Sequence, residues 1–146
     1  MNRAMGHHVR WSACVVWAGW MAAIPAWGIG QGQTLDRVIL DTDAEGVQRT
    51  TMILDSYSYS PNYLIVEAGK PVELTLNSIT TLTPHNFVLR EPAVGLMIDQ
   101  DVAAGKSKTI RFTASRPGLY SFYCDKKLLF FKSHREKGME GLIEVR

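Results

Sequence analysis

The sequence predicts an all-β sandwich, and three observations support this fold class. Short runs rich in β-branched and aromatic residues recur along the chain, and turn residues separate them about every ten residues. Within residues 71–77, Val72, Leu74 and Leu76 alternate with polar residues, which is the period of a strand with one face in a core. No long stretch combines helical spacing of apolar residues with capping residues. A sandwich is therefore favoured over an alternating βαβ chain.

The predicted elements follow one another at short intervals. Asp43–Gly46 is a turn cluster, and Ala68–Lys70 is expected to form a hairpin-like connection. One or two helical turns can form within residues 125–137. Strands are expected at residues 35–41, 47–55, 63–67, 71–77, 87–90, 107–113, 118–123 and 141–146.

The first 28 residues are expected to be a secretory signal peptide. Arg3 and Arg10 precede an apolar stretch, and Ala26 to Gly28 supplies small residues of the kind that a signal peptidase recognises. An uncleaved membrane anchor is the alternative, because the stretch is nearly long enough to span a bilayer. Residues 29–34 would then be a linker and residues 35–146 one domain, located in the periplasm.

The charge balance gives no sign of a nucleic-acid partner. Without Arg3 and Arg10, the chain has fourteen basic and fourteen acidic residues, so no global field would attract phosphate. The charges are uneven, however, because residues 124–146 hold six basic and four acidic groups. This local basic surface is either a solvated face or a surface that steers an acidic partner.

The few soft ligands of the chain point to copper. Beyond residue 28, Cys124 is the only cysteine, so it cannot form an internal disulfide. His85 and His134 are the only histidines in the same part of the chain, and Met139 supplies a thioether. One thiolate, two imidazoles and a weak axial thioether are the ligands of a mononuclear type 1 copper site. The sequence therefore predicts one copper ion per chain.

The local sequence around each residue supports this site. Cys124 ends the strand at residues 118–123, on the face that carries Tyr120 and Phe122. His85 follows Pro84, which stiffens the junction between loop and strand, and Asn86 is placed to hydrogen-bond across the rim between the two ligand-bearing segments. Taken singly, such a cysteine is more often a buried small hydrophobe and such a histidine a surface residue.

The chain resembles the bacterial cupredoxins, the superfamily of plastocyanin and azurin, over residues 59–146. The resemblance implies an eight-stranded Greek-key sandwich with copper held at one end by His85, Cys124 and His134, and with Met139 as the axial ligand. The segments that carry it are residues 59–77, His85-Asn86-Phe87, residues 118–124, and His134 together with residues 138–145.

One departure from the family pattern is the length of the ligand loop. Family members usually have two to four residues between the cysteine and the second histidine, whereas nine residues, 125–133, lie here. This leaves open whether the site is an ordinary blue site or a distorted one. A binuclear copper centre, as in oxidase subunit II, is excluded because its loop needs two cysteines.

The inserted segment Leu128–Phe131 is expected to pack over the copper end, because four adjacent bulky apolar residues are costly to expose. The alternative is an exposed docking patch with a cationic rim formed by Lys126, Lys127 and Lys132.

These features predict a one-electron carrier, not an enzyme, that serves a redox partner protein. Three strong ligands and an axial thioether leave no open position for a substrate. The alternative is periplasmic copper storage or delivery to a copper-accepting protein, and a third possibility is a metal-free structural domain. Contact with a membrane is expected only if the N-terminal segment stays uncleaved.

Overall fold

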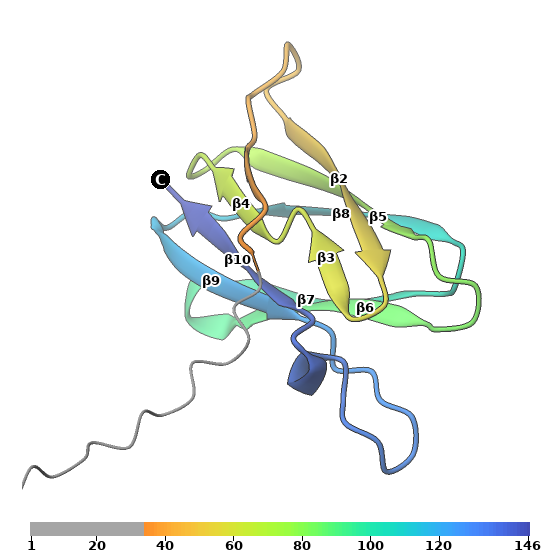
Figure 1. Ribbon diagram of the computed structural model, residues 1–146. Coiled ribbons are helices and arrows are strands. Elements are labelled where there is room, and N and C mark those ends of the chain that lie inside the picture. Colours follow the sequence, from red (N-terminus) through yellow and green to blue (C-terminus); the bar gives the residue numbers. More distant parts are fainter. Residues whose placement is uncertain (1–33) are drawn as a thin grey trace, which may run out of the picture. The chain divides into compact units, whose positions relative to one another are not determined.

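The computed structural model describes residues 34–146, which form two β-sheets (Figure 1). The expected signal segment and linker residues 29–33 lie outside the described residues. The six-stranded sheet has the order β1-β4-β10-β9-β6-β7, and the four-stranded sheet has the order β3-β2-β5-β8. The strands are β1 (Arg37–Ile39), β2 (Gln48–Asp55), β3 (Ser58–Ser60), β4 (Tyr63–Val66), β5 (Pro71–Ser78), β6 (His85–Glu91), β7 (Leu96–Val102), β8 (Ser107–Thr113), β9 (Gly118–Tyr123) and β10 (Glu140–Val145).

The two-sheet sandwich confirms the predicted fold class, and a strand overlaps each expected range. The resemblance implied eight strands, and the two additional ones are β3 and β7. β3 has only three residues. β7 forms an edge of the six-stranded sheet, and its middle residues, Met97 to Asp101, are exposed or half-buried. β3 is too short to show a period, and the alternation of β7 is interrupted in sequence because the exposed Met97 is apolar and the half-buried Gln100 is polar.

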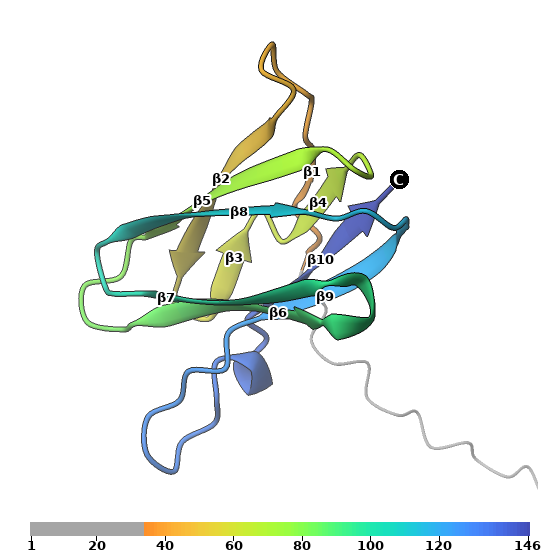
Figure 2. The same ribbon diagram turned by 180° about the vertical axis from the view of Figure 1, so that it is seen from behind.

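The hairpin expected at Ala68–Lys70 is wrong, because β4 and β5 belong to different sheets (Figure 2). The N–H of Ala68 donates to the carbonyl of Arg146, beyond the end of β10, and the N–H of Gly69 donates to that of Ala114, beyond β8. Gly69 has φ 75°, a conformation that glycine adopts without strain. A turn signal predicts a change of direction, but not whether the next strand pairs with the last.

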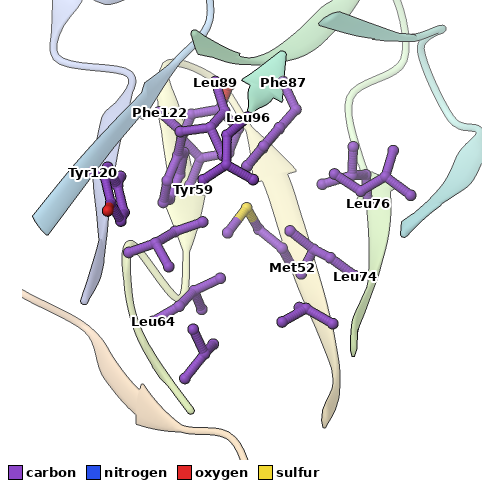
Figure 3. Close-up of a cluster of buried hydrophobic side chains, with 14 of the residues drawn as sticks. Met52, Tyr59, Leu64, Leu74, Leu76, Phe87, Leu89, Leu96, Tyr120 and Phe122 are labelled. Carbon is purple, nitrogen blue, oxygen red and sulfur yellow. The ribbon is translucent and has the colours of Figure 1, made fainter. Parts of the chain in front are cut away.

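The core lies between the two sheets. Val72, Leu74 and Leu76 of β5 are fully buried, as their alternation predicted. Figure 3 shows the side chains that β5 and its neighbours send into this space. Phe87 of β6 stacks on Phe122 of β9, with ring centroids 4.8 Å apart. Burial of these apolar surfaces is the main force that stabilises the sandwich, and it fixes the ends of β6 and β9 from which the site is built.

Two 3₁₀ turns, η1 (Pro92–Val94) and η2 (Arg135–Lys137), complete the described residues. The helical turns expected within residues 125–137 are therefore reduced to one 3₁₀ turn, which follows His134 rather than forming around Leu128. No helix in residues 34–146 has both the length and the hydropathy needed to cross a membrane.

Candidate metal centre

Three of the four predicted ligands meet at one end of the sandwich. His85 is the first residue of β6, Cys124 directly follows β9, and His134 directly precedes η2. All three side chains are buried, and their potential ligand atoms lie within 4.8 Å of one another. This is the cluster of metal-binding side chains found in the described residues.

The polar atoms of this cluster fit a metal ion. The Sγ of Cys124 lies 3.3 Å from Nδ1 of His134, and the two imidazole rings have centroids 5.1 Å apart. Both ring nitrogens of His85 are buried and have no hydrogen-bond partner among residues 34–146. Buried polar atoms are nearly always satisfied in folded proteins, and a metal ion would supply the partner that one of these nitrogens needs.

Burial sets the protonation of the three groups. It lowers the pKa of His85 to about 4, and the nearby His134 acts in the same direction. Burial also lowers the pKa of His134, assisted by Lys137. Both imidazoles are therefore neutral at pH 7, the form that binds metals. Burial raises the pKa of the Cys124 thiol, an effect that hydrogen bonds from backbone N–H groups partly offset.

Backbone hydrogen bonds fix the position of Cys124. Its N–H donates to the carbonyl of Met139 at 3.0 Å, and its carbonyl accepts from the N–H of Arg135 at 2.8 Å. Its Sγ accepts a long hydrogen bond, 3.4 Å, from the N–H of Asn86. The thiol is held between β6 and the residues that lead into β10, which limits its freedom to move away from the two histidines.

Asn86 joins the two ligand-bearing segments, as the sequence predicted. Its Nδ2 donates to the carboxylate of Asp125 at 2.8 Å and to that of Asp99 at 3.1 Å. Its Oδ1 accepts from the N–H of Asp125 at 3.1 Å. Because Asp125 follows Cys124 and Asn86 follows His85, this amide links the neighbours of two predicted ligands directly.

Met139 is fully buried in the same core cluster as Cys124. Its N–H donates to the carbonyl of His134 at 2.9 Å, so its backbone is tied to a second predicted ligand. Its role as the axial ligand stays a prediction. Met97, by contrast, is 63% exposed on β7 and pairs with Arg90, five residues along β6 from His85.

The expected packing of Leu128–Phe131 over the copper end is wrong. The side chains of Leu128, Leu129, Phe130 and Phe131 are 68%, 72%, 85% and 54% exposed. The nine-residue loop is closed at its base, where the N–H of His134 donates to the carbonyl of Lys126 at 2.8 Å. This bond returns His134 to the site without help from the residues between, so they need not pack against the sandwich.

Two tyrosines at the site were not assigned a role from the sequence. Tyr59 is buried, and its hydroxyl donates to the carbonyl of Asn86 at 2.5 Å. Burial, followed by the proximity of Cys124, raises its pKa, so the phenol stays protonated. Tyr57 meets the ring of His134 edge-on at 5.0 Å. Tyr57 and Tyr59 alternate with serines in a polar stretch, and this pattern did not indicate that both side chains would lie near the metal ligands.

Comparisons with known proteins identify the family. A family model described as a cupredoxin-like domain matches residues 13–139. The chain belongs to the cupredoxin family. This cupredoxin is 26% identical over 102 residues to a plastocyanin of Dryopteris crassirhizoma, a match that covers 62% of the chain and 90% of the plastocyanin.

Solved structures share the fold of this cupredoxin. One is the metal-binding domain of the Cu(I)-exporting P-type ATPase of Streptococcus pneumoniae D39, solved with Cu(I). It is 20% identical to this chain, with a TM-score of 0.57. The match covers 78% of this chain and 99% of the ATPase domain. Reduced auracyanin from Roseiflexus castenholzii is 22% identical, with a TM-score of 0.54, and the match covers 67% and 96% of the two chains.

The donor set of this cupredoxin suits copper. A buried thiolate with two neutral imidazoles is the trigonal set of a mononuclear copper site, and the three side chains can hold one such ion. Hard cations such as Mg²⁺ and Ca²⁺ prefer oxygen ligands, which the cluster of His85, Cys124 and His134 does not offer.

Proposed function

We propose that this cupredoxin is an exported one-electron carrier whose copper ion is bound by His85, Cys124 and His134, with Met139 as the axial ligand. The observation that supports it most is the buried meeting of two imidazoles and one thiol, in which neither nitrogen of His85 has a hydrogen-bond partner within residues 34–146. Such a cluster is costly in an apolar environment unless it binds an ion.

Copper supplies a one-electron change between Cu(I) and Cu(II) when it is bound. The chain contributes rigidity, because His85 and Cys124 are attached to strands of one sheet and the Asn86 amide fixes the distance between their segments. It also excludes water, since all three proposed equatorial ligands are buried. A fixed, dry ligand set keeps the rearrangement that accompanies electron transfer small.

The same features argue against catalysis. The three side chains and the Met139 thioether would complete the coordination of the ion, which leaves no position for a substrate. We therefore propose a redox partner protein, rather than a small substrate, as the source or acceptor of the electron. The predicted signal peptide would place this exchange in the periplasm.

The experiment is the visible and EPR spectrum of residues 33–146 after one equivalent of Cu(II). We expect an intense thiolate-to-copper band from the wild type, and its loss in Cys124→Ser with an unchanged far-ultraviolet circular dichroism spectrum. Cys124 is the only cysteine in this part of the chain and therefore the only source of the band. A coloured, folded Cys124→Ser protein would refute the assignment.

Copper storage or delivery is the second candidate function. The ligand loop is the reason to test it, because nine residues lie between Cys124 and His134 and the site would open if the bond from the His134 N–H to the Lys126 carbonyl broke. The Cu(I)-bound ATPase domain shows that such a fold also occurs in a copper-exporting protein. A reversible potential with fast electron self-exchange would support the carrier, whereas rapid transfer of the copper ion to a chelating acceptor protein would support delivery.

A further inference from the structure

The loop between Lys126 and His134 exposes a surface that the metal centre does not use. We name Leu128–Phe131 the apolar tip, because all four side chains are more than half exposed. Figures 1 and 2 both show this loop extending away from the strands, beyond the end of β9. We propose that the apolar tip inserts into the interface of a lipid bilayer that contains anionic lipids.

The backbone of the tip holds an apolar side chain in an exposed, uncommon conformation. Leu129 has φ 48°, in the left-handed region that glycine or asparagine occupies at little cost and leucine does not. The N–H of Phe131 donates to the carbonyl of Leu128 at 3.0 Å, which closes a turn around this residue. A leucine held in this conformation while 72% exposed contributes nothing to the core. Its apolar side chain is available for contact with an apolar surface outside the domain, such as the acyl region of a bilayer.

Basic residues stand directly behind the tip on both sides. Lys126 and Lys127 precede it and Lys132 follows it, and we name these three the lysine collar. Lys126 pairs with Asp101 at 2.7 Å, but Lys127 and Lys132 form no ion pair within residues 34–146. Residues 126–137 contain five basic side chains and one acidic side chain. Lys127 and Lys132 therefore present positive charge that no ion pair within residues 34–146 neutralises.

The order of these groups matches the layers of a bilayer. An apolar tip that enters the acyl boundary brings the lysines behind it to the level of the phosphate groups. A flat apolar face would suit a protein partner, whereas a projecting tip of four contiguous side chains would require a deep cavity in that partner. A second copy of the chain is disfavoured because it would bring two lysine collars together.

A neighbouring loop adds a second apolar contact. Leu82 is 88% exposed, and it lines the same hollow of about 480 Å³ as Leu128 and Phe131. His134 lines this hollow as well. Insertion of both loops would therefore place the metal end of the sandwich against the membrane. The proposal does not depend on the metal, because the turn of the tip and the closure of its loop are backbone hydrogen bonds that involve no ligand side chain.

The test uses residues 33–146, which form a compact unit containing the whole core cluster and exclude the apolar N-terminal segment. Vesicles of equal parts phosphatidylglycerol and phosphatidylcholine are sedimented with the protein and compared with pure phosphatidylcholine vesicles. We expect binding to the anionic vesicles, weakened about tenfold or more in Phe130→Ser/Phe131→Ser. Leu119→Ser, an exposed leucine at the start of β9, is the matched control and should bind like the wild type.

The lysine collar is tested in the same way. Lys127→Gln/Lys132→Gln should lose about thirtyfold in affinity at low salt, at about 1 kcal/mol per lysine. Lys70→Gln/Arg116→Gln, which removes two exposed charges from the opposite end of the sandwich, is the control and should change nothing.

Insertion itself has a direct readout, because residues 33–146 contain no tryptophan. A Phe130→Trp reporter should show a blue-shifted emission on the anionic vesicles and quenching by brominated acyl chains. Absence of vesicle binding, an unshifted emission, or binding that Phe130→Ser/Phe131→Ser leaves intact would overturn the proposal. Concentration-dependent dimerisation that Phe130→Ser/Phe131→Ser abolishes, without vesicle binding, would assign the tip to a second copy instead.

Discussion

Replacement of Asn86 by alanine should destabilise the sandwich and loosen the metal centre together. The Asn86 side chain is buried and makes three hydrogen bonds, two to the carboxylates of Asp99 and Asp125 and one from the N–H of Asp125. The two carboxylate groups are about half exposed, so water reduces the gain from each bond. At about 1 kcal/mol per bond, the substitution should lower the free energy of unfolding by about 3 kcal/mol.

The assay is urea unfolding of the copper-free protein, followed by circular dichroism. For a domain of this size, 3 kcal/mol corresponds to a fall in melting temperature of about 12 °C. Asn77→Ala on β5 is the matched control, because Asn77 makes one exposed hydrogen bond, with Ser107 at 2.8 Å, and should cost less than about 1 kcal/mol.

The metal-bound protein gives a second measurement. Loss of the Asn86 link frees Asp125 and hence Cys124, so copper affinity should fall by about 10- to 100-fold. An Asn86→Ala protein that is as stable as Asn77→Ala and binds copper as tightly as the wild type would refute the bridging role of this amide.

Three further predictions concern the axial position, a close contact in the core and the response to acid. Met139→Leu should retain copper and raise the reduction potential, measured by voltammetry, because loss of a weak donor disfavours Cu(II) more than Cu(I); Met97→Leu should change neither. Gly141→Ala should destabilise the protein by about 3 kcal/mol in thermal unfolding. A Cβ at this position would lie 2.4 Å from the carbonyl oxygen of Asn62 and 2.4 Å from the Phe122 ring. Unchanged stability would contradict this contact. In the metal-free protein, His85 has a pKa lowered to about 4, so below about pH 6.5 the unfolded chain takes up a proton that the folded chain does not. Stability should therefore fall by up to about 1.4 kcal/mol per pH unit until about pH 4, and His85→Gln should show a shallower slope.

The sandwich was predictable because its central strands carry a periodic signal. Val72, Leu74 and Leu76 alternate with polar residues, and each is fully buried against the opposite sheet. The same logic placed Cys124 on the inner face of β9, beyond Phe122. β7 was missed because its apolar and polar residues alternate imperfectly: Met97 is apolar but exposed, and Gln100 is polar but half-buried, which an edge strand with one neighbour tolerates.

The meeting of His85, Cys124 and His134 could be anticipated from ligand chemistry, since few other soft donors exist beyond residue 28. The exposure of Leu128–Phe131 could not be anticipated from the sequence. Hydrophobicity alone predicts burial, but backbone hydrogen bonds at the base of the loop, from His134 to Lys126 and from Arg135 to Cys124, hold His134 in place, and no side-chain pattern encodes them. The role of Tyr59 was equally hidden, because its hydroxyl meets a main-chain carbonyl that the fold, not the local sequence, brings near.

The hydrogen bond between Lys126 and His134 also separates the length and composition of the loop from the spacing of the ligands, two properties that a ligand loop usually couples. Residues 127–132 form the part of the loop beyond this hydrogen bond, so their number and composition can vary while the spacing from Cys124 to the imidazole stays the same. Ser133 is excepted, because it hydrogen-bonds Glu136 in the turn after His134. The segment is thus a site of permissive insertion beside a metal ion. A short turn, an epitope or a foreign recognition peptide could be exchanged there, and any sequence whose ends preserve the closing bond would leave the ligand geometry unchanged.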